Sequence, residues 1–516
     1  MGCASHLPRA SSITLAPRLS TTHSKAAWTL AIALAFTGVA AADSIREDEP
    51  AEGLQLSPCQ IEDAARFSVL SAECGTLLVP ENPAAPDGRK ISLHVARVAA
   101  INRRKAPDPL FILAGGPGMA ATTMYAGTSP AFARIQRNRD IVLVDQRGTG
   151  QSNALDCALD DNALLRSTPA EIAADTKRCL AELSKRADVA FYTTSVAVQD
   201  LDRVRAALGY EQINLYGSSY GTRVGEHYLR RFPDRTRAVI LDGVVAPEQA
   251  LGPAIALDAE NALRAVLNRC ARDGACTKRF GDPMATYRAL RESVETHPVP
   301  VDFTDPTTGE AIHLAFGPLQ LATVLRLSTY TSEQAAVLPL MLHLARSGNF
   351  TPLAGQFMLM LHNYGDALAY GMHNSVVCTE DVPFFKPESI DRAKLSQTFL
   401  GVVQVDALQS LCTDWPRGPM DADLHAPLNS NVPVLLLSGG NDPVTPKEGA
   451  EAARAGLKQS LHLVLEGLGH GQLAAPCMDR VMAQFIERGS VAGLDTSCTK
   501  NAKALPFFLS PAGPTP

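Results

Sequence analysis

Ser219 is the residue whose surroundings most clearly suggest catalysis. It is the central residue of Gly217-Ser218-Ser219-Tyr220-Gly221, which matches the pattern G-x-S-x-G. This stretch follows an apolar segment, 212–217, that reads as a strand, and it leads into a charged segment that reads as a helix ending near Pro233. A sharp strand-to-helix turn strains the residue at its centre and leaves no room for side chains two positions away. The glycines therefore favour Ser219 over Ser218 as a nucleophile, with an ordinary Gly/Ser-rich turn as the alternative.

A serine hydroxyl is a weak nucleophile, so it needs a base that is itself oriented by an acid. Asp442 follows the apolar strand predicted over 432–440, and His470 follows the next one, 461–467. The carboxyl ends of parallel strands meet at one edge of a sheet, so the three side chains can converge there. The alternatives are a turn-capping role for Asp442 before Pro443 and a turn role for His470.

The segment "FILAGGPGMA" offers small residues directly after another predicted strand, 109–115. Such residues let backbone N–H groups approach a substrate oxygen, and the residue after the nucleophile supplies a second N–H. We therefore predict an oxyanion hole made by the amides of Gly116 and Tyr220, with Gly115 as the alternative to Gly116. A phosphate-binding loop is disfavoured, because no lysine follows and Pro117 removes a donor.

The elements that position these residues alternate between short apolar strands and helical patterns. Near-continuous apolar strands are typical of a parallel sheet covered by helices on both faces. Further strands are predicted over 140–148 and 237–243, and two earlier strands surround the turn at Pro86-Asp87-Gly88. Between about 246 and 426 the pattern becomes mainly helical, which predicts a cap inserted over the edge where ligands bind.

The N-terminus has the features of an export signal. Basic residues precede an apolar run of about 15 residues with no acidic residue before Asp43, and Ala40-Ala41-Ala42 fits a cleavage site. An uncleaved membrane anchor is the alternative. We thus divide the chain into a signal peptide (1–42), a first core part (43–245), the cap (246–426) and a last core part (427–516). The formal charge of −6 gives no basic footprint for nucleic acid.

Eleven cysteines are present, and Cys3 belongs to the predicted signal. Without Cys3 ten cysteines remain, and an even number in an exported chain indicates disulfides. We expect each of the ten to pair with its neighbour in sequence. The expected pairs are 59–74, 157–179, 270–276, 378–412 and 477–498. The spacings lack the close pairs of a zinc site, so metal binding is the weaker alternative. The absence of HExxH and GxxxxGK[ST] patterns gives no support to a metal or nucleotide cofactor.

Five stretches together carry a family resemblance: "GGPGMA", "VDQRGTGQS", "YGSSYGTR", "LSGGNDPVTP" and "GLGHG". In this order they resemble the prolyl aminopeptidase/tripeptidyl aminopeptidase family of α/β-hydrolases, including its cysteine-bearing C-terminal segment. The resemblance covers most of the chain after the signal and implies hydrolysis of peptides from a free N-terminus through an acyl-enzyme. The family's GGPG segment often follows a histidine, where this chain has Ala114, which implies a modest change in the support of the oxyanion hole.

An aminopeptidase must hold an α-ammonium group, which calls for carboxylates near the nucleophile. In the resembled family acidic residues of the cap bind this amine, which implies Glu380 first and Asp381 second; a helix-start or surface pair before Pro383 is the alternative. Asp145, Gln146 and Arg147 are expected to be structural, forming an internal charge pair.

The leading hypothesis is therefore an exported, periplasmic or secreted serine aminopeptidase. It would act on peptides with a free N-terminus, without a cofactor and without stable membrane insertion after signal cleavage. A carboxylesterase with the same triad is the second hypothesis, and a non-catalytic binding protein is the third.

Overall fold

The computed structural model of the protein describes residues 54–157, 169–365 and 367–514. The predicted signal peptide, residues 1–42, lies outside the described residues. Within the described ranges no helix combines the length and the apolar character needed to cross a membrane.

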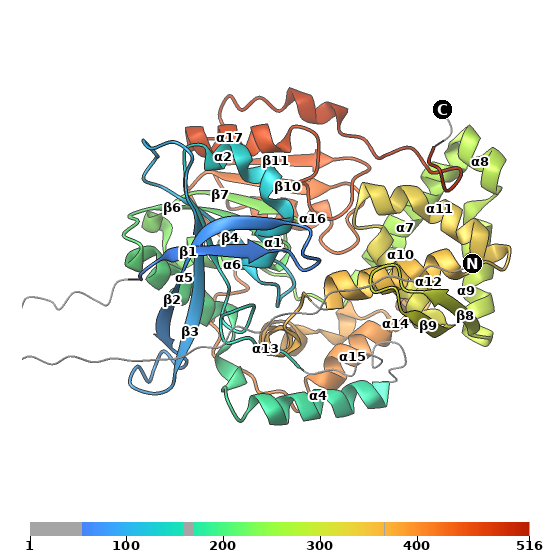
Figure 1. Ribbon diagram of the computed structural model, residues 1–516, viewed down its shortest axis with the longest axis horizontal. Coiled ribbons are helices and arrows are strands. Elements are labelled where there is room, and N and C mark those ends of the chain that lie inside the picture. Colours follow the sequence, from blue (N-terminus) through green and yellow to red (C-terminus); the bar gives the residue numbers. More distant parts are fainter. Residues whose placement is uncertain (1–53, 158–168, 366, 515–516) are drawn as a thin grey trace, which may run out of the picture. The chain divides into compact units, whose positions relative to one another are not determined.

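A nine-stranded sheet is the centre of the fold, with strand order β1-β2-β3-β5-β4-β6-β7-β10-β11 (Figure 1). Neighbouring strands from β5 to β11 run parallel, whereas β1, β2 and β3 join by antiparallel pairing. The predicted, mostly parallel sheet is confirmed, and β1 is an additional edge strand that the sequence pattern did not reveal. The strands are β1 (Ser57–Glu62), β2 (Val69–Pro80), β3 (Lys90–Val98), β4 (Leu110–Leu113), β5 (Ile141–Val144), β6 (Ile213–Ser218), β7 (Thr236–Asp242), β10 (Val434–Gly439) and β11 (Ser460–Leu465).

Both faces of the sheet are buried by helices, which is why the central strands read as unbroken apolar runs. On β4, Phe111 and Leu113 belong to one hydrophobic cluster, while Leu110 and Ile112 belong to the cluster on the opposite face. Helices of the first face are α5 (Thr194–Ala207), α6 (Tyr220–Arg231) and α16 (Lys447–Arg454). Helices of the second face are α1 (Ala121–Thr128), α2 (Ala133–Gln136) and α17 (Met478–Arg488).

The segment between β7 and β10 is mainly helical and carries a hydrophobic cluster of its own. Figure 1 shows several of its helices beside the hairpin of β8 (Val299–Thr304) and β9 (Ala311–Phe316), two strands that the helical pattern did not predict. The domain limits at 245/246 and 426/427 stay predictions. The helices are α7 (Ile255–Arg272), α8 (Gly274–Phe280), α9 (Pro283–Thr296), α10 (Pro318–Ser328), α11 (Ser332–Arg346), α12 (Thr351–Met360), α14 (Arg392–Leu395) and α15 (Val403–Leu411).

Helix α13 (Tyr370–Glu380) belongs to the inserted segment but packs differently. Its residues Met372, Val376 and Val377 join the hydrophobic cluster on the first face of the main sheet, together with Leu183 of α4 (Pro169–Leu183). The inserted chain therefore returns to the core of the main sheet before it reaches β10, which brings α13 close to the loops at the ends of the strands.

The described part of the chain contains five disulfides, and the expected neighbour pairing is confirmed for all of them. The Cys378–Cys412 bond joins α13 to the residue after α15. Five disulfides in one chain indicate folding in an oxidising environment.

Candidate active site

Ser219 stands at the junction of β6 and α6 in a conformation that few non-glycine residues adopt, with φ 55° and ψ −123°. Its N–H donates to the carbonyl oxygen of Asp242 at 2.8 Å. A β-carbon at Gly217 would overlap the carbonyl of Gly221, and one at Gly221 would overlap the carbonyl of Leu113. The turn is therefore tight enough to require glycine at both positions, for the steric reason that the sequence suggests.

Asp442 and His470 form a hydrogen-bonded pair at the ends of neighbouring strands β10 and β11. His470 Nδ1 donates to Asp442 Oδ2 at 2.8 Å and lies 3.0 Å from Oδ1. The carboxylate also accepts hydrogen bonds from the N–H groups of Val444 and Thr445 and from Thr445 Oγ1. Since Nδ1 is held by the carboxylate, Nε2 is the nitrogen left to exchange protons with a nucleophile.

A second buried carboxylate, Asp242, lies next to this pair at the end of β7. It accepts hydrogen bonds from the N–H of Gln472, at 2.8 and 3.0 Å, and from the hydroxyl of Tyr216 at 2.8 Å. It thereby ties the strand that leads to Ser219 to the loop that carries His470. Burial raises the pKa of Asp242 to about 6, although these hydrogen bonds and the nearby His470 oppose the rise.

The pKa of His470 reflects opposing influences. Burial disfavours the charged imidazolium, but the negative charge and hydrogen bond of Asp442, helped by Asp242, outweigh it and raise the pKa above its ordinary value. His470 is therefore a stronger base than a histidine buried among apolar groups.

Ser219 and His470 both lie beside the end of β7, at Asp242 and Gly243 respectively. The Ser219 N–H binds the carbonyl of Asp242, and a β-carbon at Gly243 would lie 3.0 Å from His470 Cε1. Within the described part of the chain Ser219 Oγ forms no hydrogen bond, and its side chain is partly exposed. Catalytic hydrogen bonds are often long before substrate binds, so this arrangement is compatible with a serine–histidine pair.

The Gly-rich loop after β4 lies beside Ser219. A β-carbon at Gly115 would lie 3.1 Å from Ser219 Cβ, and Gly115 is buried whereas Gly116 is exposed. Among the described residues, the N–H groups of Gly116 and Tyr220 donate to no protein acceptor. His373 of α13 donates from Nδ1 to the carbonyl of Pro117 at 3.2 Å, so a histidine of the inserted segment contacts the loop.

Glu380 and Asp381 lie at the end of α13 and are fully buried. Arg223 of α6 donates to both oxygens of Asp381, at 2.8 and 3.2 Å, and lies 3.5 Å from Glu380. Glu380 also accepts hydrogen bonds from the N–H and the hydroxyl of Thr194, at 2.7 and 2.8 Å. Both carboxylates thus have internal partners. Burial raises the pKa of Glu380 to about 7, against the opposing effect of Arg223.

This cluster reaches the candidate nucleophile through Tyr220. The Tyr220 hydroxyl lies 2.7 Å from Thr194 Oγ1 and accepts a hydrogen bond from Gln146 Nε2 at 3.0 Å. Arg147 is fully buried and pairs with Asp200 at 2.7 Å, so the internal charge pair joins Arg147 to α5 and not to Asp145. Asp145 instead accepts hydrogen bonds from Thr122.

Three residues that contact the candidate site were not predicted from the sequence: Asp242, Thr445 and His373. Asp242 ends a predicted strand next to the one that leads to Ser219, and this position was a usable signal. Thr445 follows Asp442 by three residues, which is the spacing of a side chain that bonds back to a turn carboxylate. His373 carries no local signal, because only the tertiary structure brings α13 to the Gly-rich loop.

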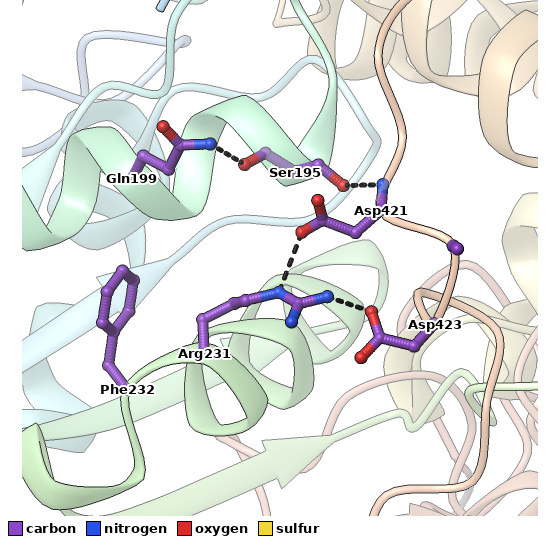
Figure 2. Close-up of a pocket in the computed structure, with 7 residues that line it drawn as sticks. Ser195, Gln199, Arg231, Phe232, Asp421 and Asp423 are labelled. Carbon is purple, nitrogen blue, oxygen red and sulfur yellow. Dashed lines mark hydrogen bonds and ion pairs between the residues drawn. The ribbon is translucent and has the colours of Figure 1, made fainter.

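A cavity of about 580 Å³ lies elsewhere, at the end of α6 remote from Ser219 (Figure 2). Figure 2 shows Arg231 between Asp421 and Asp423, with Asp421 Oδ2 2.8 Å from the Arg231 Nε. Ser195 Oγ accepts the N–H of Asp421 at 2.9 Å. The polar groups of this cavity thus satisfy one another, and none of the predicted site residues lines it.

Comparison with known proteins agrees with this geometry. Residues 108–293 match the alpha/beta hydrolase fold family, and residues 397–498 match the TAP-like protein family. Serine protease Hip1 of Mycobacterium tuberculosis is 28% identical over 517 residues, covering 91% of this chain and 96% of that protein. Tripeptidyl aminopeptidase of Streptomyces lividans is 25% identical over 476 residues, covering 84% and 85%. Carboxylesterase B of M. tuberculosis is 30% identical over 490 residues, covering 85% and 89%.

The fold and these relatives define the chain as an α/β-hydrolase of the serine hydrolase class. Two further findings assign it to a family within that class: residues 397–498 match the TAP-like protein family, and one relative is 30% identical over most of both chains. The chain belongs to the tripeptidyl aminopeptidase-like family of α/β-hydrolases.

Proposed function

We propose that the protein is an exported serine aminopeptidase that releases single residues or short di- or tripeptides from free N-termini. The observation that carries the proposal is the His470–Asp442 pair, placed against Gly243 beside the strained turn of Ser219. A base that is oriented by a buried acid and lies beside a partly exposed serine is the arrangement that activates a hydroxyl.

The proposed reaction proceeds through an acyl-enzyme. The Ser219 hydroxyl proton passes to His470 Nε2 as Oγ attacks the substrate carbonyl, and the N–H groups of Gly116 and Tyr220 hold the oxyanion. Protonated His470, stabilised by Asp442, gives its proton to the leaving amine, and the C–N bond breaks. Water then gives a proton to His470 and attacks the ester carbon, and Ser219 recovers the proton as the acyl group leaves.

Recognition of the substrate's α-ammonium is proposed for the cluster of Glu380 and Asp381. Two carboxylates face the single guanidinium of Arg223, so the cluster has a net negative charge when both are ionised. Thr194 connects Glu380 to the hydroxyl of Tyr220, the residue after Ser219, and this connection supports an amine site beside the candidate nucleophile. Because both carboxylates are buried and already bonded, an ammonium group would have to enter the cluster and share Glu380 with Thr194.

The test compares peptide amides that have a free N-terminus with the same peptides after N-acetylation. We expect a large preference for the free amine in kcat/KM, and Glu380→Gln should reduce it mainly through KM. Equal rates on both substrates would contradict the amine requirement. Ser219→Ala is the control for contaminating peptidases.

A carboxylesterase is the second candidate function. It is favoured by the resemblance to carboxylesterase B and by the internal partners of Glu380 and Asp381, which leave no open carboxylate for an amine. Hydrolysis of small esters, together with no turnover of any peptide amide by the same preparation, would support it over the peptidase.

A further inference from the structure

The side chain of Arg326, on α10, has a buried Nε and no bonded partner among the described residues. Several cap arginines pair with a neighbouring acid, including Arg264 with Glu260 and Arg392 with Asp406. Arg326, in contrast, has a buried Nε without a hydrogen-bond partner, and among the described residues no carboxylate forms an ion pair with it. A buried donor without an acceptor is costly, so such a group is expected to have a partner in a functional state.

Arg326 occupies the last turn of α10, which is fixed against the loop of the candidate base. The carbonyl of Arg326 accepts hydrogen bonds from the N–H and hydroxyl of Thr329. Directly after this turn, the carbonyl of Tyr330 accepts the N–H of His470 at 2.7 Å, and the two rings lie 5.1 Å apart. A β-carbon at Gly469 would overlap the carbonyl of Thr329, so the two backbones are in contact.

The charge of Arg326 acts on both sides of the candidate site. Burial lowers the pKa of His373, and the Arg326 charge lowers it further. Burial also opposes protonation of His470, and Arg326 adds to that effect while Asp442 and Asp242 outweigh them both. His373 holds the Gly-rich loop through Pro117, so the same charge influences one histidine on each side of the candidate site.

The carboxylates nearest the base cannot serve this guanidinium, because they are already bonded. Asp442 is held by His470 and Thr445, and Asp242 by Gln472 and Tyr216. Asp442 and Asp242 are therefore not free to pair with Arg326, and its guanidinium is available to an anion from outside the chain. Arginine binds planar anions, above all carboxylates, through paired N–H donors.

We propose that Arg326 binds a carboxylate of the substrate close to the scissile bond, an inference that rests on the proposed peptidase function. This carboxylate has two possible sources. One is the side chain of an Asp or Glu residue flanking the cleaved bond, and the other is the C-terminal carboxylate of a short peptide.

The experiment measures kcat/KM on matched peptides with a free N-terminus. The first arm exchanges Asp for Asn, and Glu for Gln, at the residues on either side of the cleaved bond, in peptides blocked as C-terminal amides. The second arm compares a neutral short peptide as free acid and as amide. A preference in the first arm identifies a side-chain carboxylate, and a preference in the second identifies the C-terminal one.

We expect the wild-type enzyme to prefer the carboxylate in one arm by roughly 10- to 100-fold, the range of a hydrogen bond to a charged group. Arg326→Gln should abolish the preference while neutral peptides are still cleaved, and Arg326→Lys should retain part of it. Arg346→Gln, which changes an exposed arginine at the remote end of α11, is the matched control and should keep the full preference.

A preference that persists in Arg326→Gln would overturn the proposal, as would a wild-type enzyme that cleaves charged and neutral peptides equally. In both cases cleavage of neutral peptides would leave the proposed function standing, whereas failure to cleave any peptide would remove the function itself. If Arg326→Gln does not fold, the wild-type preference must still shrink as salt rises, because a partly exposed charge pair is screened. A preference that is insensitive to salt would then count against Arg326.

Discussion

His470 Nδ1 lies 2.8 Å from Asp442 Oδ2, across the ends of two neighbouring parallel strands. The register of β10 and β11 makes this contact possible, because the last residues of the two strands, Gly439 and Leu465, are paired with each other. The loops that follow these strands place Asp442 and His470 at the same edge of the sheet, where Ser219 directly follows β6.

Asp442→Asn tests the orientation of the base. The amide cannot stabilise the imidazolium and would favour the wrong tautomer of His470, so we expect kcat to fall about 10⁴-fold. The melting temperature and circular dichroism spectrum should stay close to those of the wild type. A loss of less than tenfold in a folded variant would contradict the role of Asp442.

Asp242→Asn tests the second carboxylate as a positioning residue. His470 must be neutral to act as a base, so kcat/KM should fall as the pH drops through its pKa. Asp242 helps to raise that pKa, and its removal should therefore shift the acidic limb of the pH profile to lower pH. The matched control is Asp234→Asn, an exposed carboxylate at the other end of α6, which should leave the limb in place. An unchanged limb, or a shift to higher pH, in Asp242→Asn would refute this role.

Gly221→Ala tests the tight turn. The added β-carbon would overlap the carbonyl of Leu113 on β4, so the backbone around Ser219 must move. We expect a loss of at least ~2 kcal/mol in the free energy of unfolding, together with loss of activity. Gly355 of α12 has no atom within contact of such a carbon, and Gly355→Ala should be neutral or stabilising by up to about 1 kcal/mol. Denaturant titration of both variants measures these free energies of unfolding, and similar values for the two would contradict the steric explanation.

The disulfides allow a ranking of stabilities. Replacing Cys378 and Cys412 by alanine opens a loop with a sequence separation of 34, whereas Cys270 and Cys276 are separated by 6. Loop-closure entropy predicts losses of about 4 and about 2 kcal/mol respectively. Thermal unfolding of the two double variants measures the difference, and the reverse order would show that entropy is not the main contribution.

The positions of the three candidate triad residues at strand ends could be predicted from the sequence, whereas their catalytic roles stay predictions. Ser219, Asp442 and His470 each follow an apolar strand, and the periodicity of the sheet brings such positions together. The cysteine pairing was also predictable, since neighbouring cysteines in sequence are held by short loops. The edge strand β1 and the β8–β9 hairpin were not predicted, because short, partly exposed strands lack a strong apolar pattern.

The cap contacts could not be predicted, because they depend on tertiary packing alone. Arg223 pairs with Asp381 across 158 positions, and this pairing changes the surroundings expected for the acidic residues of α13. The position of Arg326 depends on how the end of α10 lies against the His470 loop, which no local pattern encodes.

Labelling the purified enzyme with a fluorophosphonate, and locating the adduct by mass spectrometry, tests whether Ser219 is the nucleophile. We expect one adduct, on the peptide that contains Ser219, and no adduct and no turnover in Ser219→Ala. An adduct on another residue, or a Ser219→Ala variant that retains full activity, would contradict it.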